Sequence, residues 1–257
     1  PVERHAGPHQ AGDHLWRLLA AGPVHTQQCA ARPKAVAVLR RFHQRDLRHG
    51  AEQAGHIAGA LNLGAGPAMS LWGGWFIDPE KRILLIVDEH EKDNVVRYLR
   101  RTGFNNFAGY LEGGMSAWSN AGYALQQIPQ RSVQQLKEAG NKLQLVDVRS
   151  SAEHDQGFIP GAVHIPLARL IEQLGKLNPE VATAVYCGAG YRASLATSLL
   201  RRHGFKNVNN IPGSWKAWRE AGFPIAGRAS DTVCVPSVRI PQISLRPTAP
   251  LAAKVAL

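Results

Sequence analysis

The sequence predicts an α/β protein built from two copies of one domain, each a small, mostly parallel sheet flanked by helices. Blocks of sequence recur along the chain, and short apolar runs alternate with runs of helical spacing. The 257 residues, 44% hydrophobic and 19% charged, are typical of a globular chain long enough for two domains.

The repeat consists of three blocks that return in the same order about one hundred residues later. The clearest is "LRRTGFNNFAGYLEGGMSAW", beginning at Leu99, which returns as "LRRHGFKNVNNIPGSWKAW", beginning at Leu200. Agreement in order and spacing argues against chance. The matched blocks are 46–63 with 147–165, 83–99 with 183–200, and 99–123 with 200–223.

These blocks divide the chain into four parts. We expect a first domain at 35–125 and a second at 126–226. Residues 1–34 show no pattern that indicates a structure or a function. Residues 227–257 contain four prolines and no sustained period, so this tail is expected to be extended or disordered.

The first copy is expected to be catalytically silent. Its first strand, the polar "RFHQRD" (Arg41–Asp46), is degraded in comparison with the apolar "LQLVD" (Leu143–Asp147) of the second copy. Alignment of the next strand ends places Asp88 of "IVDEH" against Cys187, and no glycine follows in that turn. This copy therefore cannot carry thiol chemistry at that place.

The second copy begins with "LQLVDVRSSAEHDQGFIPGAVHIP", which predicts a strand, an acidic helical turn, a glycine and proline bend, and another short strand. Asp147 and Arg149 lie at the end of the first of these strands. Two interpretations stay open for them. They form either a pair in the active site or a buried ion pair that ties the strand end to a neighbouring loop.

The candidate nucleophile is Cys187, between the apolar run Ala182–Tyr186 and a run of helical spacing. At this position the thiol would face unpaired amide groups and the positive end of a helix dipole, which favour the thiolate. Gly188 and Gly190 would let the backbone curl around the sulfur. The pattern favours a nucleophile in an anion-binding cradle, and the alternative is an inert, packed cysteine.

The cysteine count excludes other kinds of site. Cys29, Cys187 and Cys234 are widely spaced and odd in number, which argues against a disulfide framework and a cysteine-rich metal site. The histidines of "HAGPHQAGDH" (His5–His14) are too scattered for a metal centre. We expect no metal and no cofactor.

The net charge of +11 lies mostly at the two ends of the chain. Residues 1–54 and 227–257 together have 12 basic and 5 acidic residues, against 18 and 14 in residues 55–226. The middle has no basic stripe with interleaved aromatic residues, so attraction of small anions is expected rather than nucleic-acid binding. No apolar run approaches the roughly 20 residues that span a bilayer, and a cytoplasmic location without membrane contact is expected.

The motifs "DVRSSAEHDQGFIPGAVHIP", "CGAGYRA" and "LRRHGFKNVNNIPGSWKAWREAGFPI" resemble the rhodanese sulfurtransferases in order and spacing. The resemblance covers about residues 130–226 strongly and about 35–125 in degenerate form, so two rhodanese-like domains are expected. The pairing of a silent with an active copy is similar to the C-terminal part of persulfide dioxygenases that fuse a metallo-β-lactamase domain to rhodanese domains. The iron-binding histidine cluster of that dioxygenase domain is not in this sequence.

The resemblance implies a sulfurtransferase that works through a persulfide on Cys187. The donor would be thiosulfate or a glutathione-type persulfide, and the acceptor cyanide, glutathione or a protein thiol. Arg192 would bind an anionic donor or brace the loop, and Tyr191 would line the entrance and influence donor choice. The amide groups that would stabilise the terminal sulfur are those of Gly188, Ala189, Gly190, Tyr191 and Arg192.

Two other functions use the same cysteine. The fold resembles that of dual-specificity phosphatases and arsenate reductases, but their loop has five residues between cysteine and arginine. Four separate Cys187 from Arg192, and this smaller cradle favours a single sulfur over phosphate. A third interpretation is a sulfur-carrier or regulatory module that accepts persulfide from a protein partner, with the silent copy as docking surface.

Overall fold

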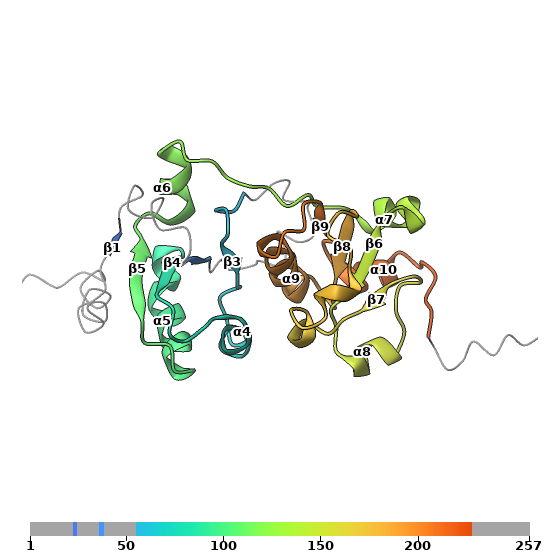
Figure 1. Cartoon of the computed structure of the whole chain (residues 1–257), viewed down its shortest axis with the longest axis horizontal. Coiled ribbons are helices and arrows are strands. Elements are labelled where there is room, and N and C mark those ends of the chain that lie inside the picture. The colour runs from blue at the N-terminus through green and yellow to red at the C-terminus, as the bar shows by residue number, and fades with distance from the viewer. Residues whose placement is uncertain (1–22, 25–35, 39–54, 228–257) are drawn as a thin grey trace, which may run out of the picture.

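The computed structural model describes residues 55–227 and two short strands at 23–24 and 36–38. It contains two parallel sheets, one in each copy, each accompanied by helices (Figure 1). The predicted α/β fold with two repeated domains is confirmed. The predictions for the tail, for most of residues 1–34 and for Arg41–Asp46 lie outside the described residues.

The sheet of the first copy has five strands in the order β1-β5-β4-β2-β3, and all its pairs are parallel. Its central strand, β4, is buried along its whole length. The strand that pairs with both β3 and β4 is Val36–Val38, which precedes the polar segment that the sequence suggested. The strands are β1 (Pro23–Val24), β2 (Val36–Val38), β3 (Leu61–Asn62), β4 (Ile83–Ile86) and β5 (Phe107–Leu111).

The sheet of the second copy has four parallel strands in the order β7-β6-β8-β9. Strand β8 lies between β6 and β9, and all four of its residues are buried. The carboxyl end of β8 is therefore an inner position of the edge at which parallel α/β folds bind their ligands. The strands are β6 (Gln144–Asp147), β7 (Val163–His164), β8 (Thr183–Tyr186) and β9 (Val208–Asn210).

Helices follow most of the strands, as expected for parallel pairs that need a crossover. The helices of the first copy are α4 (Ala68–Phe76), α5 (Lys92–Arg101) and α6 (Gly114–Asn120), with a 3-10 turn η1 (Glu89–Glu91). Those of the second copy are α7 (Val133–Ala139), α8 (Ser151–Asp155), α9 (Tyr191–Arg202) and α10 (Ser214–Glu220), with 3-10 turns η2 (Gly140–Lys142), η3 (Leu167–Arg169) and η4 (Leu174–Lys176).

Local sequence explains where the helices of the second copy begin. At α7 and α8 a serine caps the first turn and a Gln or Glu three residues later bonds back to the cap, so both helices start with a full capping box. Helix α9 instead has Gly190 as its N-cap, with a φ of 118° that residues with a Cβ rarely adopt. The chain turns sharply there, three residues after Cys187.

One of the hydrophobic clusters among the described residues spans both copies. A single cluster of buried side chains includes Leu61 and Leu63 of the first copy together with Leu195 and Leu199 of α9. Helix α9 lies against β3, so it is the part of the second copy that faces the first (Figure 1). No helix among the described residues is long and apolar enough to cross a bilayer.

Candidate active site

Cys187 is the first residue after β8, the strand that lies between β6 and β9 in the second sheet. Its thiol is free and the residue is only 1% exposed. The side chain therefore lies at the carboxyl edge of the sheet, inside the molecule, as the strand and turn pattern predicted.

The turn after Cys187 directs an amide group at the sulfur. The backbone N–H of Gly190 donates to Cys187 Sγ over 3.1 Å. The first bond across a full turn of α9 runs from Ser194 N to Gly190 O. The amide groups of residues 191–193 precede that bond, so they have no partner within the helix and add positive potential at this end. The arrangement can stabilise a negatively charged sulfur.

The start of α10 fixes the carbonyl side of the same turn. Trp215 N donates to the Cys187 carbonyl over 2.9 Å, and Lys216 N donates to the Gly188 carbonyl over 3.0 Å. Because these two carbonyl oxygens are occupied by α10, the turn has a fixed orientation. Neither contact was foreseen, since the sequence places Trp215 about thirty residues downstream of the cysteine.

Arg192, the second residue of α9, makes a two-pronged ion pair with Glu153 of α8. Arg192 Nη1 lies 2.6 Å from Glu153 Oε2, and Arg192 Nη2 lies 2.7 Å from Oε1. The bond to Glu153 raises the pKa of Arg192, and Cys187 raises it further through its charge and a hydrogen bond. The same pair lowers the pKa of Glu153 to about 2. Of the two roles considered for Arg192, this geometry favours bracing of the loop.

Asp147 and Arg149 form a buried ion pair, 0% and 1% exposed. Arg149 Nε and Nη2 donate to the two carboxylate oxygens, and Nη2 also donates to the Gly157 carbonyl. Tyr186 Oη donates to the carboxylate and His154 Nδ1 lies 3.0 Å from it. Burial alone would raise the pKa of Asp147, but the hydrogen bonds from Arg149 and His154 hold it below its usual range.

The Asp147 and Arg149 pair ties the end of β6 to the segment that carries Glu153. Arg149 Nη1 donates to the Glu153 carbonyl over 3.3 Å. Its guanidinium also lies over the ring of Trp215, 4.4 Å from the centroid. Both contacts reach elements that hold the cysteine turn, which fits the interpretation of a structural ion pair behind the site.

Tyr191 connects the loop to the first copy. Its hydroxyl donates to the Gly64 carbonyl over 3.0 Å, and burial raises the pKa of Tyr191 to about 12. Next to it, Asn62 donates from its side chain to Ser194 Oγ and from its backbone to Ser198 Oγ. Helix α9 thus rests on residues 62–64 of the first copy, a contact that no sequence pattern indicated.

Glu153 is the most important residue that sequence reasoning missed. A local signal for it exists, because Ser150-x-x-Glu153 is a capping box and places the carboxylate at the start of α8. The signal predicts a helix start and says nothing of Arg192, which lies 39 residues further along the chain.

The corresponding place in the first copy is closed to this chemistry. Strand β4 ends at Ile86 and β8 at Tyr186, so the residue directly after the strand is Val87 in one copy and Cys187 in the other. Asp88, which the sequence alignment set against the cysteine, lies one position later. The turn η1 follows, and the amine of Lys92 is buried against Glu89 at 2.6 Å and over the Tyr110 ring.

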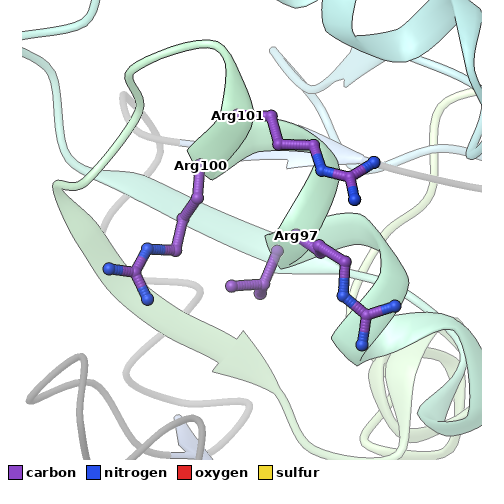
Figure 2. Close-up of a pocket in the computed structure, with 4 residues that line it drawn as sticks. Arg97, Arg100 and Arg101 are labelled. Atoms are coloured by element: carbon purple, nitrogen blue, oxygen red, sulfur yellow. The ribbon is translucent and has the colours of Figure 1, made fainter.

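A cavity of about 290 Å³ lies on the first copy (Figure 2). It is lined by Val96 and by the three arginines of α5, Arg97, Arg100 and Arg101. None of these four side chains is a nucleophile. Among the described residues no group of three metal-binding side chains occurs, and His5–His14 lies outside them.

Comparison with known proteins gives one family. The Rhodanese-like domain family matches this chain twice, over residues 40–121 and 130–221. Among curated proteins the chain is 29% identical over 107 residues to "Putative sulfur carrier protein YrkF" of Bacillus subtilis, a match of 42% of this chain and 57% of that protein's length. It is 33% identical over 81 residues to a "Sulfurtransferase" of Allochromatium vinosum, covering 32% of this chain and 76% of that protein.

Solved structures give similar matches. A rhodanese-related protein from Thermoplasma volcanium is 27% identical to this chain, with a TM-score of 0.37. The match covers 39% of this chain and 99% of that protein.

Proposed function

The chain belongs to the rhodanese family, and we propose that it is a sulfurtransferase in which Cys187 carries the transferred sulfur. The observation that carries the proposal is the position of Cys187. Cys187 directly follows β8, the strand between β6 and β9, and the Gly190 amide of the glycine turn donates to its sulfur. Relatives named as a sulfurtransferase and a sulfur carrier support this activity.

In the first half-reaction, the Cys187 thiolate attacks the outer sulfur of the donor. A bond forms between Cys187 Sγ and that sulfur, and the sulfur–sulfur bond of the donor breaks. The leaving group, sulfite from thiosulfate or a thiolate from an alkyl persulfide, takes the bonding electron pair. Cys187 is left as a persulfide, whose negative charge the amide groups of residues 188–192 would stabilise.

In the second half-reaction, an acceptor thiolate or cyanide attacks the outer sulfur of the persulfide. The new bond joins acceptor and sulfur, and the electron pair of the broken bond returns to Cys187 Sγ. The enzyme regains its thiolate without an oxidant or a reductant. The scheme is ping-pong covalent catalysis, and it needs no cofactor.

A second candidate function is a carrier that receives sulfur only from a protein partner. The similarity to a protein named as a sulfur carrier favours it. Both functions use the Cys187 persulfide, and the rate with free donors distinguishes them. Turnover with thiosulfate or glutathione persulfide supports an enzyme, whereas loading only from a protein donor supports a carrier.

The relation to persulfide dioxygenase fusions also belongs to this proposal. The pairing of a silent with an active copy supports the rhodanese half of such a fusion, with a low-molecular-weight persulfide as donor. Glutathione persulfide that loads Cys187 faster than thiosulfate would support this relation, and the reverse preference would argue against it.

The test of the proposed function is the mass of the intact protein after brief incubation with thiosulfate or glutathione persulfide. We expect one added sulfur atom, which cyanide removes and which Cys187→Ser does not acquire. The matched control is the double variant Cys29→Ser with Cys234→Ser, which keeps Cys187 and should still be loaded. No adduct on the wild type with any donor would refute the sulfurtransferase.

A further inference from the structure

The ion pair between Glu153 and Arg192 lies directly on the cysteine loop. A Cβ placed on Gly188 would meet Arg192 Nη2 at 3.1 Å and Glu153 Oε1 at 3.6 Å. The absence of a side chain at this position lets both charged groups close over the turn. The guanidinium of Arg192 interacts with the carboxylate of Glu153, 2.7 Å from its Oε1, and also with Cys187.

Glu153 is held in this position by α8 as well as by Arg192. Its Oε2 accepts from Ser150 N over 3.0 Å and from Ser150 Oγ over 2.8 Å, and its own N–H donates to Ser150 Oγ. The bond from Arg149 to its carbonyl fixes the backbone behind it. A carboxylate with this many donors remains ionised and pre-organised, so it does not swing away freely when a ligand approaches.

The charges around the cysteine balance before any donor binds. Arg192 is matched by Glu153, and buried Arg149 is matched by Asp147. Among the described residues, the two guanidinium groups that contact the turn or the residues behind it are therefore each paired with a carboxylate. Lys216, whose amide bonds to the turn, has an exposed side chain that lies 3.9 Å from Glu220. A negatively charged donor must therefore compete with Glu153 for Arg192.

We propose that Glu153 is a specificity-determining residue that selects against doubly charged sulfur donors by holding Arg192. Thiosulfate concentrates two negative charges on one small ion, whereas an alkyl persulfide brings one charge to the same sulfur. Repulsion by the carboxylate and the loss of a free guanidinium both weigh more heavily on the dianion. The inference rests on the proposed sulfurtransferase and names its donor class, an organic persulfide whose reacting end carries a single negative charge.

The experiment compares the rate constants at which thiosulfate and glutathione persulfide load sulfur onto the purified full chain. Glu153→Gln keeps the size of the side chain and removes its charge. We expect the ratio of the thiosulfate rate to the persulfide rate to rise about tenfold in this variant, on the scale of one rearranged charge contact. The thiosulfate rate of the variant should also fall more steeply with salt, because a freed guanidinium attracts anions over a screened distance.

The matched control is Glu172→Gln, which removes the carboxylate of an exposed pair with Arg169 in the same copy. It should leave the ratio unchanged. A ratio in Glu153→Gln within twofold of wild type, with both donors active, would overturn the role of Glu153 while the sulfurtransferase stands. Loading from neither donor in the wild type would overturn both.

If Glu153→Gln does not fold, Glu153→Asp takes its place. The shorter side chain keeps the charge but cannot span the same distance to Arg192, so the ratio should still rise, by less than in the glutamine variant. An unchanged ratio in this variant would overturn the inference. Thermal unfolding of each variant shows which of the two measurements applies.

Discussion

The loops after β4 and β8 occupy equivalent places in two copies of one fold, yet they differ in the residues that form the turn. After β8, Cys187 is followed by a glycine turn in which the Gly190 amide donates to the sulfur. After β4, Val87 and Asp88 are followed by the 3-10 turn η1, and the buried amine of Lys92 lies against Glu89 and over the Tyr110 ring. The sheet therefore determines only where the residue after the strand lies. The turn determines whether a thiol at that place would be stabilised as a thiolate.

The largest expected effect comes from removing the cysteine after β8 and placing one at the equivalent position after β4. Cys187→Ser should reduce sulfur loading at least about 1,000-fold, on the scale seen when a nucleophile is removed. Adding Val87→Cys to this variant should restore nothing, because the first turn has no glycine and no free amide cradle. Intact-protein mass after incubation with donor measures both. An added sulfur on the double variant would contradict this account of the two turns.

A smaller effect should follow from changing the glycine that makes the cradle. Gly190 has φ 118°, and an alanine there would be strained by roughly 1–3 kcal/mol or would move the amide away from the sulfur. We expect Gly190→Ala to lower the loading rate about 10- to 100-fold, since 1.4 kcal/mol corresponds to a factor of ten. The mass of the intact protein in samples quenched at set times, at several donor concentrations, gives this rate.

The matched control for Gly190→Ala lies in the silent copy. Gly103 has φ 91° after α5, and a Cβ there would meet no atom within 4 Å. Gly103→Ala should therefore cost similar backbone strain without any change in loading. Equal losses of activity in the two variants would mean that strain lowers activity through general stability, and the special role of the second turn would be refuted.

The next effect concerns stability in acid, to which the ion pair between Glu153 and Arg192 contributes. The pKa of Glu153 is lowered from 4.5 to about 2, so its stabilisation is complete above about pH 4.5 and is lost as the pH falls toward 2. The free energy of unfolding of Glu153→Gln should fall less steeply across this window than that of the wild type. Urea titrations at several pH values measure the slope.

Arg192→Gln provides the control for that slope, because it removes the partner that lowers the pKa of Glu153. It should flatten the same window only in part, because the bonds from Ser150 also lower the pKa of Glu153. The double variant with Glu153→Gln should have the slope of Glu153→Gln alone. A wild-type slope retained in either single variant would show that the pair does not contribute to acid stability.

The smallest expected effect tests the contact between the copies. Tyr191→Phe removes the hydroxyl that donates to the Gly64 carbonyl, and we expect a loss of about 1 kcal/mol in the free energy of unfolding, typical of one hydrogen bond. The rate at which Cys187 is loaded should change less than about threefold. Only part of the lost free energy should reach the transition state, and about 1.4 kcal/mol there would correspond to a factor of ten. A larger drop in loading than in stability would mean that the first copy also sets the geometry of the cysteine turn.

Local sequence was enough to predict the repeat, the two α/β copies and the place of Cys187 at a strand end. These follow from local patterns, since strand, glycine turn and helix leave their periods and their special residues within a short stretch of chain. The absence of a thiol and of a glycine turn after β4 could be predicted in the same way, although the strand ends shift the matching residue from Asp88 to Val87.

The contacts of Arg192 and Tyr191, in contrast, depend on tertiary packing. Arg192 meets Glu153, 39 residues away, because β6 and β8 are neighbours in the sheet and bring the loops after them to one edge. Tyr191 meets Gly64, 127 residues away, because the two copies share a core. Such partners are chosen by packing and charge among groups that the fold brings together, and no local period in the sequence records that choice.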